Sequence, residues 1–69
     1  QMNDPVKIID KACFSYIIDH QEEKKGLYLS LENCEGGAVV VACDNSTGFA
    51  YIEEFDSVRA AIKWLRREE

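Results

Sequence analysis

The sequence contains few of the residues that are abundant in disulfide-linked or fibrous proteins. It has one proline, four glycines and three cysteines in 69 residues. An odd number of cysteines without a C-x-x-C pair is not a disulfide framework and is typical of a reducing compartment. Residues 1–18 lack the basic start, apolar core and small-residue cleavage site of a secretory signal, and the longest apolar run, residues 36–43, is too short to cross a bilayer. We therefore expect a cytoplasmic protein, and we interpret Met2 as its natural start.

Positive charge is also scarce. Eight basic and 13 acidic residues give a net charge of −5. Direct binding to nucleic acid or to an anionic membrane is therefore not expected, because both need a basic footprint. A hydrophobic content of 46% favours a folded chain, and the length fits one domain over residues 1–69. Domains this small often gain stability from a partner subunit.

Apolar spacing over residues 4–20 predicts an N-terminal helix. Asn3 or Asp4 can cap it, and Pro5 suits its first turn. One face carries an apolar stripe at helical spacing, and the stripe consists of Val6, Ile9, Cys13, Tyr16, Ile17 and His20. Further apolar residues lie off that stripe, so the helix is more apolar than one docking face requires. The short apolar run at residues 13–18 is also compatible with a strand.

Three strands are expected after this helix. Residues 27–31 alternate with period two, and residues 49–52 begin a strand that ends in Glu53 and Glu54. Between them, residues 38–43 form a continuous β-branched run, which is typical of a strand buried on both faces. Short connections favour an antiparallel meander in the order 1-2-3.

A second helix should follow Asp56 or Ser57 as its cap. Its apolar stripe consists of Val58, Ala61, Ile62 and Leu65, and Trp64 lies on the flank. The predicted fold is therefore α+β: an N-terminal helix, a three-stranded antiparallel meander and a C-terminal helix, with both helices on one sheet face.

This arrangement leaves an apolar sheet face open. An exposed apolar patch usually marks an interface, and a two-fold dimer is the commonest way to cover one. We therefore expect a homodimer, formed through the open sheet face or through the first helix. Its candidate interface residues are Phe14, Ile18, Tyr28, Val39, Val41, Tyr51 and Trp64.

The side chains that could take part in catalysis or bind a cofactor do not form a recognisable motif. His20 is the only histidine, and its position favours a helix end over a general base. The three cysteines lack the close pairs of a zinc site, and Gly36-Gly37 lacks a phosphate-loop frame. Glu53 and Glu54 should point to opposite faces of a strand, and Asp56 can act as a cap. We expect no catalytic residue, no metal and no cofactor.

The one basic patch expected from the sequence is the outer side of the second helix, which carries Arg59, Lys63, Arg66 and Arg67. We interpret it as a solvated helix face whose cations complement the helix dipole.

The features above favour a non-catalytic protein-interaction or assembly module with an unknown protein partner. The alternative is an acidic inhibitor or nucleic-acid mimic that binds a basic cleft on a nuclease or DNA-binding protein. Its carboxylates would come from Asp19, Glu22, Glu23, Glu32, Glu35, Glu53 and Glu54. In element order the predicted chain resembles some small acidic phage-encoded anti-CRISPR proteins, which place a three-strand meander between helices. That resemblance includes no shared motif. An enzyme with a pocket at a dimer interface is the third hypothesis.

Overall fold

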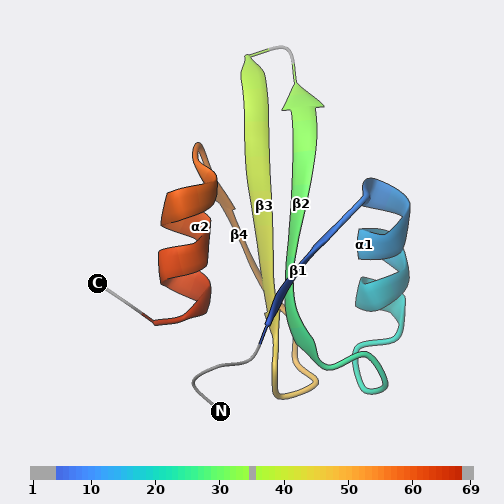
Figure 1. Ribbon diagram of the computed structural model, residues 1–69. Coiled ribbons are helices and arrows are strands. Elements are labelled where there is room, and N and C mark those ends of the chain that lie inside the picture. Colours follow the sequence, from blue (N-terminus) through green and yellow to red (C-terminus); the bar gives the residue numbers. More distant parts are fainter. Residues whose placement is uncertain (1–4, 35, 68–69) are drawn as a thin grey trace.

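A computed structural model describes residues 5–34 and 36–67, which form four strands and two helices around one sheet (Figure 1). The elements in chain order are β1 (Val6–Ile9), α1 (Lys11–Asp19), β2 (Gly26–Cys34), β3 (Gly37–Asn45), β4 (Tyr51–Phe55) and α2 (Val58–Leu65). The strands lie in the order β1-β2-β3-β4. Strand β1 is parallel to β2, and the other two pairs are antiparallel. Neither helix in the described part of the chain has the length and apolar content that a membrane crossing requires.

The α+β class and the consecutive antiparallel pairing of β2, β3 and β4 agree with the sequence prediction. The hairpin strands are longer than expected, because pairing continues through polar residues such as Glu32, opposite Val39, and Asn33, opposite Ala38. The predicted run at residues 38–43 lies in β3, an interior strand of the sheet. It is buried on both faces: Val40 and Ala42 belong to one apolar cluster and Val41 and Cys43 to the other.

The prediction of a helix from residue 4 was wrong at its start. Residues 6–9 form β1, and the helix begins at Lys11. Three of these four residues are β-branched, which favours a strand. Asp10 then caps α1, since the Cys13 amide donates to its carboxylate at 2.8 Å. Residues 13–18 are helical, so the strand alternative for them is also wrong. The expected caps Asn3 and Asp4 lie outside the described residues.

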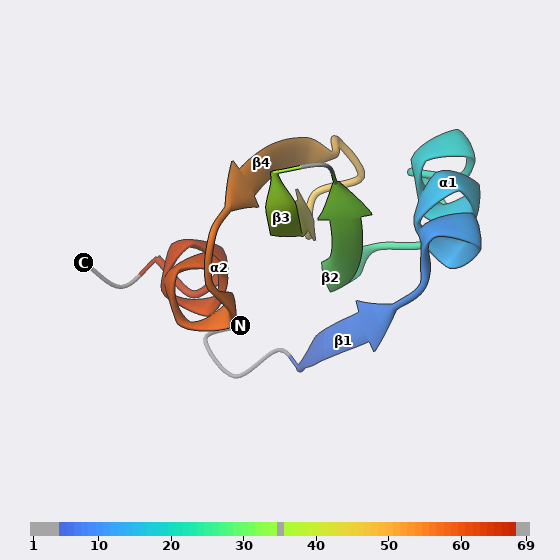
Figure 2. The ribbon, with the colours of Figure 1, turned by 90° about the horizontal axis from the view of Figure 1, so that it is seen from above.

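The two helices cover opposite faces of the sheet, which corrects the prediction that both lie on one face. Seen from above, the sheet runs between α1 on one side and α2 on the other (Figure 2). Alternation in β2 explains this arrangement: Leu27 and Leu29 pack with α2, whereas Tyr28 packs with α1. A strand that is apolar on both sides needs a cover on each side, and the β1-α1-β2 crossover supplies the second one.

Helix α2 is held by a serine cap and an apolar stripe. The Ala60 amide donates to Ser57 Oγ at 3.1 Å, so Ser57 is the cap rather than Asp56. Ala61 and Leu65 are buried against β2 and β3. Trp64 is half-buried, and its ring lies 5.7 Å from that of Phe55 at the end of β4.

Candidate functional site

Most of the predicted interface residues lie inside the chain. Phe14, Tyr28 and Val41 are buried in the cluster beneath α1, and Ile18 and Val39 pack against the same cluster. The open sheet face on which the homodimer prediction depended is therefore covered by the chain's own helix. Helix α1, the other expected dimer surface, uses Phe14, Ile17 and Ile18 for this same packing, whereas its Tyr16 is 49% exposed.

The two remaining residues, Tyr51 and Trp64, lie together at the surface. With Asp44 and Arg67 they line a hollow of about 310 Å³ beside the beginning of β4. Tyr51 is exposed and Trp64 is half-buried. The structure thus places these two residues at one site.

Exposed apolar side chains are concentrated at the start of β4. Phe49 is 69% exposed, Tyr51 57% and Ile52 46%, and these three fall within four consecutive positions. The rings of Phe49 and Tyr51 meet edge to face with centroids 6.3 Å apart. Glu53 and Glu54 follow directly and are exposed. We call this group, Phe49, Tyr51, Ile52, Glu53 and Glu54, the β4 surface.

Strand β4 also lies at the margin of the sheet. It pairs with β3 along one edge, and the strand order leaves its other edge without a neighbouring strand among the described residues. Every second backbone N–H and C=O of an edge strand points outward and can pair with another chain. The β4 surface therefore combines apolar side chains with a row of accessible backbone groups.

The turn that leads into β4 is fixed by partly buried hydrogen bonds. The Asn45 side chain is fully buried, and its Nδ2 donates to the carbonyls of Gln21 and Lys24 at 2.9 Å each. The Ala50 amide donates to Gln21 Oε1 at 3.0 Å. Gly48 has a φ of +88°, a left-handed conformation that favours glycine. These contacts hold residues 45–50 against the loop after α1, so Phe49 and Tyr51 project from an anchored turn.

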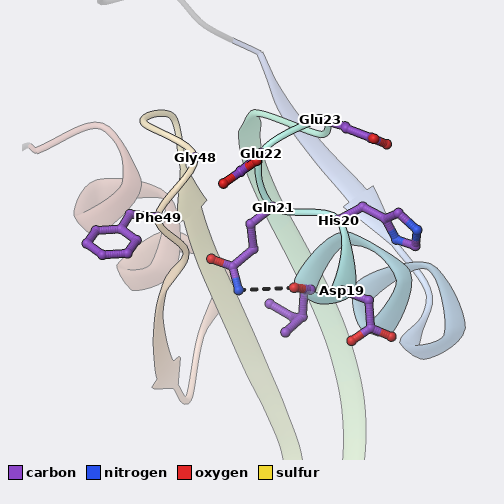
Figure 3. A pocket seen from close by; sticks show the side chains of 8 residues that line it. Asp19, His20, Gln21, Glu22, Glu23, Gly48 and Phe49 are labelled. Carbon is purple, nitrogen blue, oxygen red and sulfur yellow. Dashed lines mark hydrogen bonds between the residues drawn. The ribbon is translucent and has the colours of Figure 1, made fainter.

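A second hollow, of about 410 Å³, lies between that loop and the turn. Figure 3 shows Gln21 and Glu22 on the side that faces Phe49, whereas Asp19, His20 and Glu23 point away from it. The Gln21 Nε2 donates to the Ile18 carbonyl at 3.0 Å. The lining side chains on the Phe49 side are therefore one exposed carboxylate and an amide already used to hold the loop.

His20 lies at the C-terminal end of α1, which agrees with the prediction of a helix-end residue. Its Nδ1 lies 2.9 Å from the Tyr16 carbonyl oxygen, and its ring stacks on Tyr16 with centroids 4.0 Å apart. One ring nitrogen thus lies within hydrogen-bond distance of a backbone carbonyl in the last turn of the helix.

Asp44 is a buried carboxylate that sequence reasoning missed. Its Oδ1 accepts hydrogen bonds from the Ser46 amide, at 3.1 Å, and from Ser46 Oγ, at 2.8 Å. Its Oδ2 accepts from Arg67 Nη2 at 2.8 Å. The Asp-Asn-Ser-Thr-Gly pattern indicates a turn, which is the signal that could have located it. The pairing with Arg67 depends on tertiary structure and has no local signal.

Neither thiol whose side chain is described is activated. Burial raises the pKa of Cys43 to about 11, with a further contribution from Asp44. A hydrogen bond to Asp10 raises the pKa of Cys13 above its ordinary value. Both are protonated at neutral pH and are poor nucleophiles. Among the side chains the structure describes, no three histidine, cysteine or carboxylate groups gather to form a metal site.

The described carboxylates are spread over the molecule. Asp19, Glu22 and Glu23 lie at the end of α1 and in the loop after it, near the β3–β4 turn, whereas Glu32 lies near the β2–β3 hairpin tip. Glu53 and Glu54 occupy adjacent positions of β4 and so point to opposite faces. Glu35 lies outside the described residues. This distribution differs from the single acidic face that a nucleic-acid mimic needs.

Comparisons with models of protein families, with curated proteins and with solved structures found no significant match to this chain. Functional inference therefore depends on the residues of the chain itself.

Proposed function

We propose that this chain is a non-catalytic protein-interaction module that binds its partner through the β4 surface. The observation that carries this proposal is the exposure of Phe49, Tyr51 and Ile52 on an unpaired sheet edge. Aromatic residues anchored on a rigid element are favoured at the centres of protein interfaces.

The free energy that these three side chains would gain from further burial is modest. Complete burial of a large apolar side chain contributes about 1.5–3 kcal/mol, and roughly half of each of these three remains to be covered. Together they would contribute about 3 kcal/mol before the costs of association. Because the turn at residues 45–50 is already fixed by hydrogen bonds, little further ordering is needed on binding.

The chemistry of the site supports binding over catalysis. Tyr51 is beside Asp44, but both oxygens of that carboxylate already accept hydrogen bonds. The raised pKa values of Cys13 and Cys43 keep both thiols protonated. A binding role uses the exposed side chains of the β4 surface without requiring an activated group.

The acidic-mimic alternative receives less support, because the described carboxylates lie at both ends of the sheet. The homodimer also stays a prediction. The sheet face on which it depended is covered by α1, so a second copy would have to bind elsewhere on the surface.

The proposal is tested by affinity capture from the cells that make the protein. The Phe49→Ala/Tyr51→Ala/Ile52→Ala variant should lose captured proteins that the wild type retains. The matched control is Ile8→Ala/Leu31→Ala, because Ile8 and Leu31 are exposed to similar extents, 66% and 58%, away from β4. Circular dichroism should show both variants folded. Identical capture by the β4 variant and the wild type would contradict the proposal, and so would loss of capture in the control alone.

A further inference from the structure

The two edges of the sheet differ in how they are protected against pairing. Edge strands are usually guarded by lysine, proline or a bulge. Strand β1 has four residues and contains the exposed Lys7. Strand β4, Tyr-Ile-Glu-Glu-Phe, contains no lysine, proline or glycine, and its register runs without a bulge from Phe55, opposite Val40, to Tyr51, opposite Asp44. Its guarding residues are therefore its two glutamates.

These glutamates have no cation across the strand pair. Glu53 lies opposite Ala42, and Glu54 lies opposite Val41. Among residues 5–34 and 36–67 the sole salt bridge joins Arg67 to Asp44. The edge is thus apolar at Tyr51 and Ile52 and negative at Glu53 and Glu54, with one charge toward each face of the sheet.

We propose that β4 binds an extended segment of a partner protein as a fifth strand, and that this segment carries two consecutive basic residues opposite Glu53 and Glu54. The inference rests on the proposed function and adds the mode of binding and the chemistry of the partner. Consecutive strand residues point to opposite faces, so two adjacent basic residues meet both carboxylates. Two adjacent apolar residues then cover Tyr51 and Ile52.

This pairing fixes the order of residues in the partner. An antiparallel segment reads basic-basic-apolar-apolar, and a parallel segment reads apolar-apolar-basic-basic. Main-chain hydrogen bonds along the edge would supply affinity, and the alternating side chains would supply specificity, as in other cases of strand addition.

A second copy of this chain fits the edge less well. Each copy carries a net charge of −5. Antiparallel pairing centred on Glu53 places two like charges directly opposite each other, which is destabilising. Pairing centred on Tyr51 instead places Glu53 opposite Phe49. Neither arrangement brings a positive charge to the glutamates, whereas a basic segment does.

The experiment uses end-blocked synthetic peptides titrated into isotope-labelled protein, with the backbone amides followed by NMR. The probes are Thr-Lys-Arg-Val-Tyr-Thr for antiparallel pairing and the reversed sequence for parallel pairing. One of them should shift the amide signals of residues 51–55. It should also protect from hydrogen exchange the alternate β4 amides that are not bonded to β3. The peptide Thr-Glu-Glu-Val-Tyr-Thr should bind at least about tenfold more weakly.

Charge variants provide the control. Glu53→Lys/Glu54→Lys should weaken binding of the basic peptide by about tenfold. Glu22→Lys/Glu23→Lys changes the net charge equally, in the loop after α1, and should bind as the wild type does. Equal binding by the Glu53→Lys/Glu54→Lys variant overturns the proposal, as do shifts confined to other elements. A free protein that sediments as a dimer with protected β4 amides also overturns it, because the edge then belongs to a second copy.

Failure of this inference is distinguishable from failure of the proposed function. Capture depends on the side chains of Phe49, Tyr51 and Ile52, whereas the peptide titration is read on backbone amides and on the two glutamates. Capture that requires the β4 surface, together with unchanged β4 amides in both peptide titrations, leaves the interaction module standing and refutes strand addition.

Discussion

Asn45→Asp is the substitution that tests most strictly how the turn before β4 is held. The Asn45 side chain is fully buried, and its Nδ2 donates to the Gln21 and Lys24 carbonyls at 2.9 Å each. Aspartate has nearly the same shape but no N–H groups. When ionised, it would place a carboxylate against two carbonyl oxygens. The substitution therefore removes both hydrogen bonds without creating a cavity.

The expected loss can be worked from these contacts. Leaving a buried acceptor unpaired costs about 1–3 kcal/mol. Asn45→Ala leaves two carbonyls unpaired in partly buried positions, so it should lose about 2–4 kcal/mol. Asn45→Asp should lose more at neutral pH, because it buries an unpaired charge as well. A chain of this size has a free energy of unfolding of about 3–10 kcal/mol. The Asp variant should therefore lose a large part of this stability at neutral pH.

The Asp variant should also acquire a pH dependence of known sign. Burial against carbonyls raises the pKa of the new carboxyl in the folded state above its unfolded value of about 3.9. The folded state then holds this proton more tightly, so the stability of the variant relative to the wild type is greatest below about pH 4 and falls as the pH rises. Urea unfolding of both proteins, followed by circular dichroism at several pH values, measures this difference. An Asp variant as stable as the wild type at neutral pH, or one whose stability relative to the wild type increases with pH, would refute the role assigned to Asn45.

Three further predictions concern the cysteines and the Asp44–Arg67 ion pair. Iodoacetamide should leave buried Cys43 unmodified in the native protein at neutral pH and should react slowly with exposed Cys13, because both pKa values are raised; peptide mass mapping that finds Cys43 alkylated first would contradict this. Stability should also fall between about pH 9 and about pH 11, because the unfolded Cys43 thiol ionises before the folded one, and Cys43→Ala should show a smaller decline. Arg67→Ala should cost less than about 1 kcal/mol, since Arg67 is 73% exposed. Asp44→Ala should lower the free energy of unfolding by about 1–3 kcal/mol, because it also removes the acceptor of the Ser46 hydrogen bonds. Chemical denaturation that finds Arg67→Ala more destabilising than Asp44→Ala would contradict these roles.

The parts of the fold that sequence could predict are those with strong local patterns. The β-branched run of β3 and the apolar stripe of α2 each indicate one kind of element. Residues 6–9 are different, because Val6 and Ile9 fit a helical stripe as well as they fit a strand. Their strand conformation depends on parallel pairing with Leu27 and its neighbours, which lie beyond the following helix. Local periodicity carries no information about that pairing.

The placement of the helices on opposite faces was missed for the same reason, because it depends on the pairing of β1. The second sheet face is predicted from the sequence to be apolar at Tyr28 and Val41, but that face was assigned to a partner. Once residues 6–9 form a strand, the β1-α1-β2 crossover places α1 over this face. The apolar surplus was therefore a signal of internal packing.

The candidate site was predicted only in part. Tyr51 and Trp64 were identified as interface candidates, and the structure brings them together at the surface. Phe49 was missed as an interface residue, because its exposure depends on a turn held by Asn45 and Gln21. These two residues lie 24 positions apart in the chain, so their hydrogen bond has no local signal.

Hydrogen exchange on the protein bound to its cellular partner tests the central claim most directly. Amide protection on binding should be concentrated in residues 49–55, with α1 and β1 exchanging as in the free protein. Protection over α1 or β1 with unchanged exchange in residues 49–55 would contradict it.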